Sequence, residues 1–232
     1  MSEPHPLLVR FTDAAEGRFP PCDGGVTVLP PLPGGLECSV AFTGHAVVAT
    51  ALSAAEVRAG RPDGFGASLA PGFLRRLAGP GGWIDTVDVT LTARGTGGPA
   101  RLPEWTEGAD SHPRVLRARA LRSGVTVHGD ARGLVTLAAG LAGRRELSIE
   151  LHAPDEKARG HGRGLLTDAL SLVPEGEPVF AAVAPGNARS LRAFLGCGFV
   201  PVGSEVLLRP ERPATGCGAP GLGAPTAVEE QR

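Results

Sequence analysis

The chain has 232 residues, of which 42% are hydrophobic, so it can bury a core of ordinary density as one large domain or two small ones. Its 23 basic and 24 acidic side chains give a formal net charge of -1, which excludes a global attraction to nucleic acid or to an anionic membrane. No apolar run approaches the ~20 residues that cross a bilayer, and the first residues do not resemble a secretory signal. The sequence therefore predicts a cytoplasmic, soluble protein that binds neither nucleic acid nor membrane.

The cysteines indicate a reducing compartment. Cys22, Cys38, Cys197 and Cys217 show neither a C-x-x-C pair nor a histidine at metal-ligand spacing. Neither a zinc site nor a disulfide framework is expected, and no metal is predicted. Tyrosine is absent from the whole chain, so no side chain can supply a phenolic proton.

The amino-terminal part of the chain is rich in breaks. Prolines and glycines interrupt residues 1–35, where we expect an irregular lead-in with one edge strand at 26–29. Residues 36–42 and 46–52 are apolar and flank Thr43-Gly44-His45, which predicts two strands around a tight turn.

Two short helices and a strand are expected next. Ser53 can cap the first helix, and Pro71 suits the first turn of the second, which Gly79 ends. The run 83–93 alternates apolar with polar residues and is rich in β-branched side chains, so it predicts a strand. Glycine, proline and polar residues between 94 and 113 predict a long loop and a candidate boundary.

The second half predicts strands that alternate with helices. A basic helix is expected from Arg114, with Asp110 or Ser111 as its cap. The elements expected after it are three strands, a helix, a strand, a helix and a final strand pair, at 125–130, 134–144, 146–153, 165–172, 179–184, 187–195 and 199–208. From Pro210 apolar periodicity is lost, and a disordered tail is expected.

A glycine-rich turn stands between a predicted strand and a predicted helix. Gly160, Gly162 and Gly164 expose backbone amides where a helix amino terminus concentrates unpaired N–H groups and positive potential, which suits a diphosphate. A Rossmann turn would need glycine in place of Leu165, and no Gly-Lys-Ser/Thr motif is present, so dinucleotide binding and nucleotide hydrolysis are disfavoured. A tight connection without a ligand is the alternative interpretation of the turn.

Two motifs together resemble the GNAT superfamily of acyl-CoA-dependent N-acyltransferases. Arg159, Gly162 and Gly164 match its Gln/Arg-x-x-Gly-x-Gly/Ala motif position by position. The second motif, Asn-x-x-Ser/Ala followed by an aromatic residue and Gly-Phe, is matched by Asn187, Ser190, Phe194, Gly198 and Phe199. The resemblance covers about residues 125–208.

This resemblance implies an α/β (α+β) fold with a mixed, mostly antiparallel central sheet flanked by helices, and acetyl-CoA or another acyl-CoA as co-substrate. The expected parts are an irregular lead-in, an amino-terminal α/β region that either shares this sheet or binds the acceptor, a GNAT core and a tail, at 1–35, 36–112, 113–209 and 210–232. Acyl-CoA would insert between the strand that ends near Ala153 and the strand 179–184, with its pyrophosphate on the amides of 160–165. The residues implied in cofactor binding are Leu151, His152, Ala153, Arg159, Gly160, His161, Gly162, Arg163, Gly164, Leu165, Asn187, Ser190 and Phe194.

Acyl transfer to an amine needs a group that takes the amine's proton. Alternation along the strand from 146 puts Glu146 and Glu150 on one face with Ser148 and His152, and leucine and isoleucine on the other. Glu146 also stands where the histone-acetylating branch of the superfamily holds its base. Glu146 and Glu150 are therefore the candidate catalytic residues, and an ion pair with a neighbouring arginine is the alternative role of each.

Phe194 departs from the family pattern, because many members hold at this position a tyrosine that protonates the leaving thiolate. Three interpretations remain: the thiolate leaves unaided, Ser190 or Cys197 is recruited, or catalysis is lost. The leading hypothesis is an N-acetyltransferase for a small-molecule or peptide amine, which could form a homodimer. A catalytically degenerate acyl-CoA-binding or regulatory module is one alternative, and a partner-binding protein centred on residues 1–112 is another. Trp105 is a candidate for lining the acceptor site.

Overall fold

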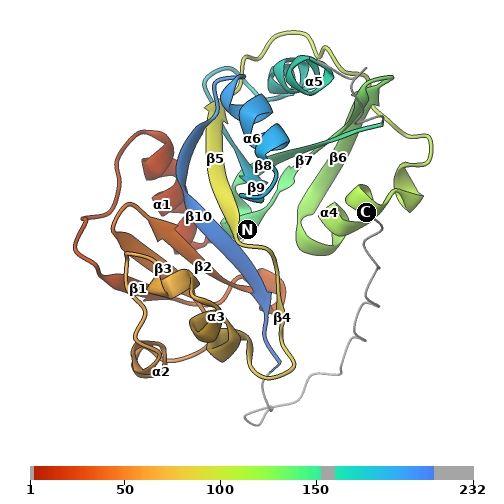
Figure 1. Cartoon of the computed structure of the whole chain (residues 1–232). Coiled ribbons are helices and arrows are strands. Elements are labelled where there is room, and N and C mark those ends of the chain that lie inside the picture. Colours follow the sequence, from red (N-terminus) through yellow and green to blue (C-terminus); the bar gives the residue numbers. More distant parts are fainter. Residues whose placement is uncertain (1–2, 153–159, 212–232) are drawn as a thin grey trace.

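The computed structural model describes residues 3–152 and 160–211, whose strands form one open mixed sheet (Figure 1). The strands are β1 (Val26–Leu29), β2 (Glu37–Phe42), β3 (His45–Ala49), β4 (Trp83–Ile84), β5 (Asp88–Arg94), β6 (Ser123–Asp130), β7 (Gly133–Ala139), β8 (Arg145–Leu151), β9 (Pro178–Val183) and β10 (Val200–Arg209). Their order is β1-β3-β2-β10-β5-β9-β8-β7-β6, with β4 beside β10. Only β1 with β3 and β8 with β9 pair in parallel among the described strands. The expected fold class, a mostly antiparallel sheet flanked by helices, is confirmed.

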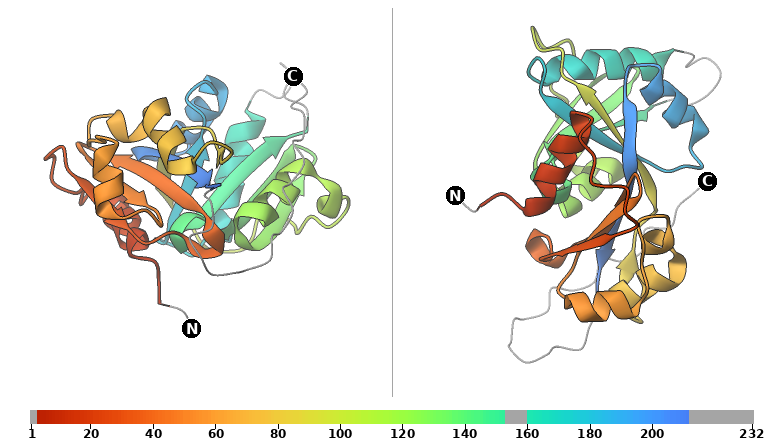
Figure 2. Two further views of the ribbon diagram at one scale, coloured as in Figure 1. Left: turned by 90° about the horizontal axis from the view of Figure 1, so that it is seen from below. Right: turned by 90° about the vertical axis from the view of Figure 1, so that its left-hand side faces the viewer.

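Helices cover both faces of this sheet (Figure 2). They are α1 (Pro6–Ala15), α2 (Ala54–Ala59), α3 (Pro71–Ala78), α4 (Pro113–Leu121), α5 (His161–Ala169) and α6 (Ala188–Leu195). We call the face covered by α1 and α4 the α4 face, and the face covered by the other four helices the α5 face. None of the described helices combines the length and the apolar character needed to cross a bilayer.

The two halves of the chain are interleaved within the sheet. Strand β5, from the amino-terminal half, lies between β9 and β10 of the carboxyl-terminal half and pairs antiparallel with both. The segment between residues 94 and 113, in which a boundary was expected, connects β5 to α4 and so joins two parts of a single sheet. Side chains from β5 can therefore contribute to a site formed by the second half.

The expectation of an irregular lead-in was wrong, because residues 6–15 form helix α1. His5 caps this helix by accepting a hydrogen bond from the amide of Leu7, and Leu7 and Phe11 are fully buried against the α4 face. The prolines that argued against structure, at 20–33, lie after this helix, and the one proline within it, Pro6, stands at its first position, where proline is compatible with a helix. The edge strand expected at 26–29 is confirmed as β1.

Three smaller expectations are also corrected. The strand expected at 83–93 is divided into β4 and β5, and the expected final strand pair is one strand, β10, with a register shift between Pro201 and Gly203. The cap of α4 is His112, whose ring accepts from the amide of Arg114, and neither Asp110 nor Ser111 serves in that role.

A buried ion network joins the centre of the sheet to α1. Arg144, 1% exposed, donates to Glu146 on β8 at 2.9 Å and to Glu205 on β10 at 2.6 Å. Its guanidinium lies over the rings of Phe11 and Phe180, 4.2 and 5.2 Å from their centroids. Each of the two buried carboxylates thus has a cationic partner, which offsets the cost of removing these charges from water.

We predict that Arg144→Met lowers the free energy of unfolding by about 3–5 kcal/mol, because two buried carboxylates lose their shared partner. The neighbouring Arg145 forms an exposed pair with Glu177, so Arg145→Met should cost less than about 1 kcal/mol. Urea unfolding of the two variants measures the difference. Equal losses would contradict a structural role specific to Arg144.

Candidate functional site

The parallel central strands β8 and β9 pair only near their amino-terminal ends and then separate. β8 and β9 pair at one position, Glu146 with Phe180, whereas β7 pairs along all of β8 and β5 along all of β9. From Ser148 and Ala182 onward, the facing edges of these two described strands no longer form a ladder. A ligand that carries its own amide groups can hydrogen-bond to backbone groups left unpaired in this way.

Helix α5 begins inside the glycine turn rather than after it. Gly160 is the N-cap with φ of +86°, a left-handed conformation that glycine adopts without strain. The amides of residues 161–163 form the first turn and have no partner within the helix, while the amide of Gly164 already donates to the carbonyl of Gly160 at 2.9 Å. The amides open to a phosphate are therefore those of 161–163, whereas the amides of Gly164 and Leu165 belong to the helix.

The space beside Gly162 is open. A Cβ added there would lie 3.8 Å from Ala193 on α6 and 3.9 Å from Leu151 at the end of β8, both at ordinary van der Waals distance. A side chain at this position would consequently point into the space between α6 and the end of β8. This glycine is not required by packing against the described residues, and its small size leaves the first turn of α5 accessible.

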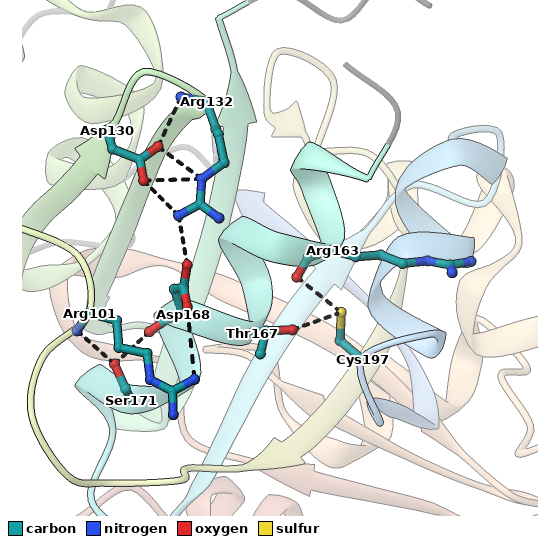
Figure 3. A network of polar contacts seen from close by, with 8 residues as sticks. All are labelled: Arg101, Asp130, Arg132, Arg163, Thr167, Asp168, Ser171 and Cys197. Carbon is teal, nitrogen blue, oxygen red and sulfur yellow. Dashed lines mark hydrogen bonds and ion pairs between the residues drawn. The ribbon is translucent and has the colours of Figure 1, made fainter. Parts of the chain in front are cut away.

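Two arginines flank this turn in different ways (Figure 3). Arg132, between β6 and β7, pairs with Asp130 at 2.6 Å and with Asp168 of α5 at 2.7 Å. Its Nη1 would lie 2.8 Å from a Cβ placed on Gly164, so its positive charge sits beside the first turns of α5. Arg163, one of the expected cofactor-binding residues, instead extends along α6, where its Nε would be 2.9 Å from a Cβ on Gly196. Sequence patterns did not indicate Arg132, because it lies outside both motifs.

The second motif forms the start of α6. Asn187 is the N-cap, and its Oδ1 accepts from the amide of Ser190 at 3.0 Å. The side-chain nitrogen of Asn187, Nδ2, can still donate to a ligand while Oδ1 caps the helix, so capping and ligand contact are compatible. Phe194 is 4% exposed and packs edge-on against Phe199, with centroids 4.9 Å apart. The Phe194 ring therefore lies in the core of the α5 face rather than on an open surface.

The remaining expected cofactor contacts lie at the end of β8. Leu151 packs against the core of the α5 face, and His152 is exposed with its ring 4.9 Å from that of Trp105. Ala153 and Arg159 lie outside the described residues. Trp105 stacks near the strand end, and its indole donates to the carbonyl of Glu107 at 2.6 Å. It does not line the pocket described below.

The two candidate catalytic carboxylates occupy the α4 face of β8, while Leu147, Ile149 and Leu151 pack on the α5 face, as alternation predicted. Glu146 is paired with Arg144 and, at 2.6 Å, with Arg122. Burial would raise the pKa of Glu146, but Arg144 and Arg122 outweigh burial and hold this pKa below its ordinary value. A carboxylate held in this state is a weak base, so the geometry favours the framework role for Glu146.

Glu150 is more open than Glu146. It accepts from Arg114 at 2.6 Å, and His112 Nε2 lies 3.8 Å from its other oxygen. Its side chain is 42% exposed, and it does not line the pocket on the α4 face that is described next. In this structure both glutamates are ion-paired with arginines, which was the alternative to a catalytic role.

A pocket of about 160 Å³ opens on the α4 face at the point where β8 and β9 separate. Ser148 and Ala182 contribute its floor from these two strands, together with Glu146 of β8, and α4 with its C-cap contributes Arg114, Arg117, Leu121 and Arg122. The rest of its lining comes from the loop before β5, from β5 and β10, and from the segment after β7: Asp85, Thr86, Asp88, Leu141, Glu205, Val206 and Leu207. The pocket and the first turn of α5 are thus on opposite faces of the sheet, on either side of the place where the ladder ends.

Asp88, at the start of β5, lines this pocket and was not among the candidates predicted from the sequence. It lies directly opposite Glu205 of β10. Burial first, and then the charges of Glu205 and Asp85, raise the pKa of Asp88 to about 7. The strand expected at 83–93 located the residue, but nothing in the sequence showed that β5 would be inserted beside β9.

No protein-family model matches the chain, and no curated protein matches it by sequence. Among solved structures the chain is similar to one described as an acetyltransferase from the GNAT family of Novosphingobium aromaticivorans DSM 12444. The two are 14% identical, the match covers 57% of this chain and 69% of that chain, and the TM-score is 0.37. Similarity at this level carries no conclusion about activity, which has to be inferred from the site itself.

Proposed function

We propose that this protein transfers an acetyl or related acyl group from acyl-CoA to an amine. The observation that supports this proposal most strongly is where the two GNAT-like motifs lie. The first motif supplies the first turn of α5, which follows β8, and the second supplies the N-cap of α6, which follows β9. Both motifs therefore stand at the carboxyl ends of the two strands that separate from each other.

In the proposed binding mode, the amides of residues 161–163 receive the pyrophosphate at the positive end of the α5 dipole. Arg132, whose charge is balanced by Asp130 and Asp168, directs its Nη1 toward this turn and can donate from there to a phosphate oxygen. The unpaired backbone edges of β8 and β9 hydrogen-bond the amides of the pantetheine arm, and Asn187 can donate to the same arm. The thioester then reaches the level of Ser148 and Ala182, where the pocket on the α4 face opens.

An enzyme is favoured over a binding module by the presence of this pocket. A sensor needs one site, whereas here a candidate cofactor turn lies on one face of the sheet and a polar pocket lies on the other, at the point where the ladder between β8 and β9 ends. Phe194 offers no hydroxyl to the departing sulfur. A thiol with a pKa near 8.5 is a tolerable leaving group, so the thiolate can leave unaided and catalysis can come mainly from positioning.

This assignment predicts release of a thiol from acetyl-CoA that depends on an added amine. The wild-type protein, incubated with acetyl-CoA and a panel of primary amines, should produce free CoA at a rate that saturates with at least one amine. Spectrophotometric thiol detection measures this rate. Tight CoA binding without thiol release across the panel would instead indicate the binding module.

A second prediction addresses the cofactor turn. Gly162→Val should weaken CoA binding at least tenfold, about 1.4 kcal/mol, because the new side chain occupies the space between Leu151 and Ala193. Isothermal titration with CoA measures the change, and thermal unfolding checks that the variant is folded.

The matched control is Gly72→Val. Gly72 also stands at the second position of a helix, α3, and no atom lies within 4 Å of its added Cβ. This control should bind CoA like the wild type. Unchanged affinity in a folded Gly162→Val protein would exclude the turn as the phosphate site.

A further inference from the structure

Every charged side chain that lines the pocket on the α4 face has an oppositely charged partner, with one exception among the described residues. The pairs are Arg117 with Asp85, Arg122 with Glu146, Arg144 with Glu205 and Arg114 with Glu150, each with a closest approach of 2.6 Å. Asp88 has neither an ion pair nor a side-chain hydrogen bond within residues 3–152 and 160–211. The described side chains of the pocket therefore include one more carboxylate than they have cationic partners for, and that carboxylate is Asp88.

Asp88 is well placed to meet a ligand. Asp88, Thr90, Ala182 and Glu205 share the α4 face, because paired residues on neighbouring strands point to the same side. Thr90 donates to Glu205 at 2.5 Å, which engages the oxygen of Glu205 that Arg144 leaves free. Both oxygens of the neighbouring carboxylate thus have a donor, whereas Asp88 is the carboxylate of this lining that has no donor to its side chain among the described residues.

We propose that this pocket binds a small primary amine carrying one positive charge, with Asp88 as its counterion and as the acceptor of one of its protons. A volume of about 160 Å³ is close to that of an engineered cavity of about 150 Å³ that holds benzene, which limits the bound part of the amine to a few carbon atoms. The role of this amine as acyl acceptor rests on the proposed function. Its binding to the pocket does not.

In the proposed reaction Asp88 accepts one proton from the amine and later releases it to water. The ammonium gives one proton to the Asp88 carboxylate, and the neutral nitrogen then forms a bond to the thioester carbonyl carbon. The C–S bond breaks, the sulfur leaves as thiolate, and the second proton lost by the nitrogen neutralises the sulfur. Asp88 releases its proton to water, so one amide, one free thiol and one proton are formed for each ammonium and thioester consumed.

The groups that face Asp88 determine its titration. Glu205 on β10, Asp85 in the preceding loop and Glu146 on β8 disfavour its ionised form, and Arg117 on α4 favours it, while Arg114 and Arg122 complete the charged lining. Above pH 7 Asp88 is ionised and can hold a cation; below pH 7 it is protonated and cannot. Affinity for an ammonium should therefore rise about tenfold between pH 6 and pH 8, in proportion to the ionised fraction.

The raised pKa of Asp88 also means that the folded protein loses stability as the pH rises. Unfolded Asp88 loses its proton near pH 4, whereas folded Asp88 keeps it until about pH 7, so ionisation costs stability progressively over this range. Asp88→Asn removes this cost. The variant should gain melting temperature relative to the wild type, and the gain should be larger at pH 8 than at pH 5.

The decisive experiment is NMR titration of the whole protein, without CoA, with n-propylamine and with neutral n-propanol. We expect the amine to shift the amides of Ser148 and Ala182, the alcohol to leave them unshifted, and Asp88→Asn to bind the amine at least tenfold more weakly. Asp110→Asn is the matched control, because the Asp110 side chain is 90% exposed and outside the pocket. Asp88→Glu, which keeps the charge, should retain amine binding.

Equal shifts with alcohol and amine, amine affinity independent of pH, or unchanged affinity in Asp88→Asn would each overturn the proposal. The pH titration uses the wild-type protein, so it decides the matter even if a variant fails to fold. Because CoA is absent, amine binding without any CoA affinity would refute the proposed acyltransferase while leaving this pocket as an amine site. CoA binding without amine binding would refute the amine site alone.

Discussion

The burial of Arg144 is the constraint on which the rest of this architecture depends. One guanidinium joins Glu146 of β8, Glu205 of β10 and the aromatic rings of Phe11 and Phe180, so it links α1 to three strands of the sheet. It lies where β8 and β9 make their only described pair, Glu146 with Phe180. The network therefore anchors the two strands at the point from which they separate, and it holds Glu146 in a state that does not suit proton transfer.

The separation of β8 and β9 divides the chemistry between the two faces of the sheet. On the α5 face, the first turn of α5 offers unpaired amides and positive potential, which suit a phosphate group. On the α4 face, a small pocket holds one carboxyl, that of Asp88, that has no ion-pair partner in the described part of the chain, among charges that are paired. A thioester that passes between the strands would bring its carbonyl from the first environment to the second. The proposed reaction follows from this arrangement of the two faces more than from any single residue.

Sequence analysis predicted the parts of this site that depend on local pattern. Two-residue alternation placed Glu146 and Glu150 on one face of β8, and the Asn187 cap of α6 was visible because capping needs only neighbouring residues. It missed α1, because the prolines and glycines that follow this helix up to residue 35 made the whole segment look irregular, and it missed Arg132 and Asp88. These two residues acquire their positions from contacts between distant segments, above all from the insertion of β5 between β9 and β10. Such pairing leaves no signal in a single sequence.

The claim that acyl-CoA enters between β8 and β9 can be tested by recording backbone amide shifts while acetyl-CoA is added to the wild-type protein. If acyl-CoA binds in this way, the largest shifts will fall on residues 161–163, at the first turn of α5, and on the facing edges of β8 and β9 beyond Glu146 and Phe180. Shifts confined to other surfaces, such as α2 and α3, would contradict this binding mode, and so would the absence of any shift at millimolar acetyl-CoA.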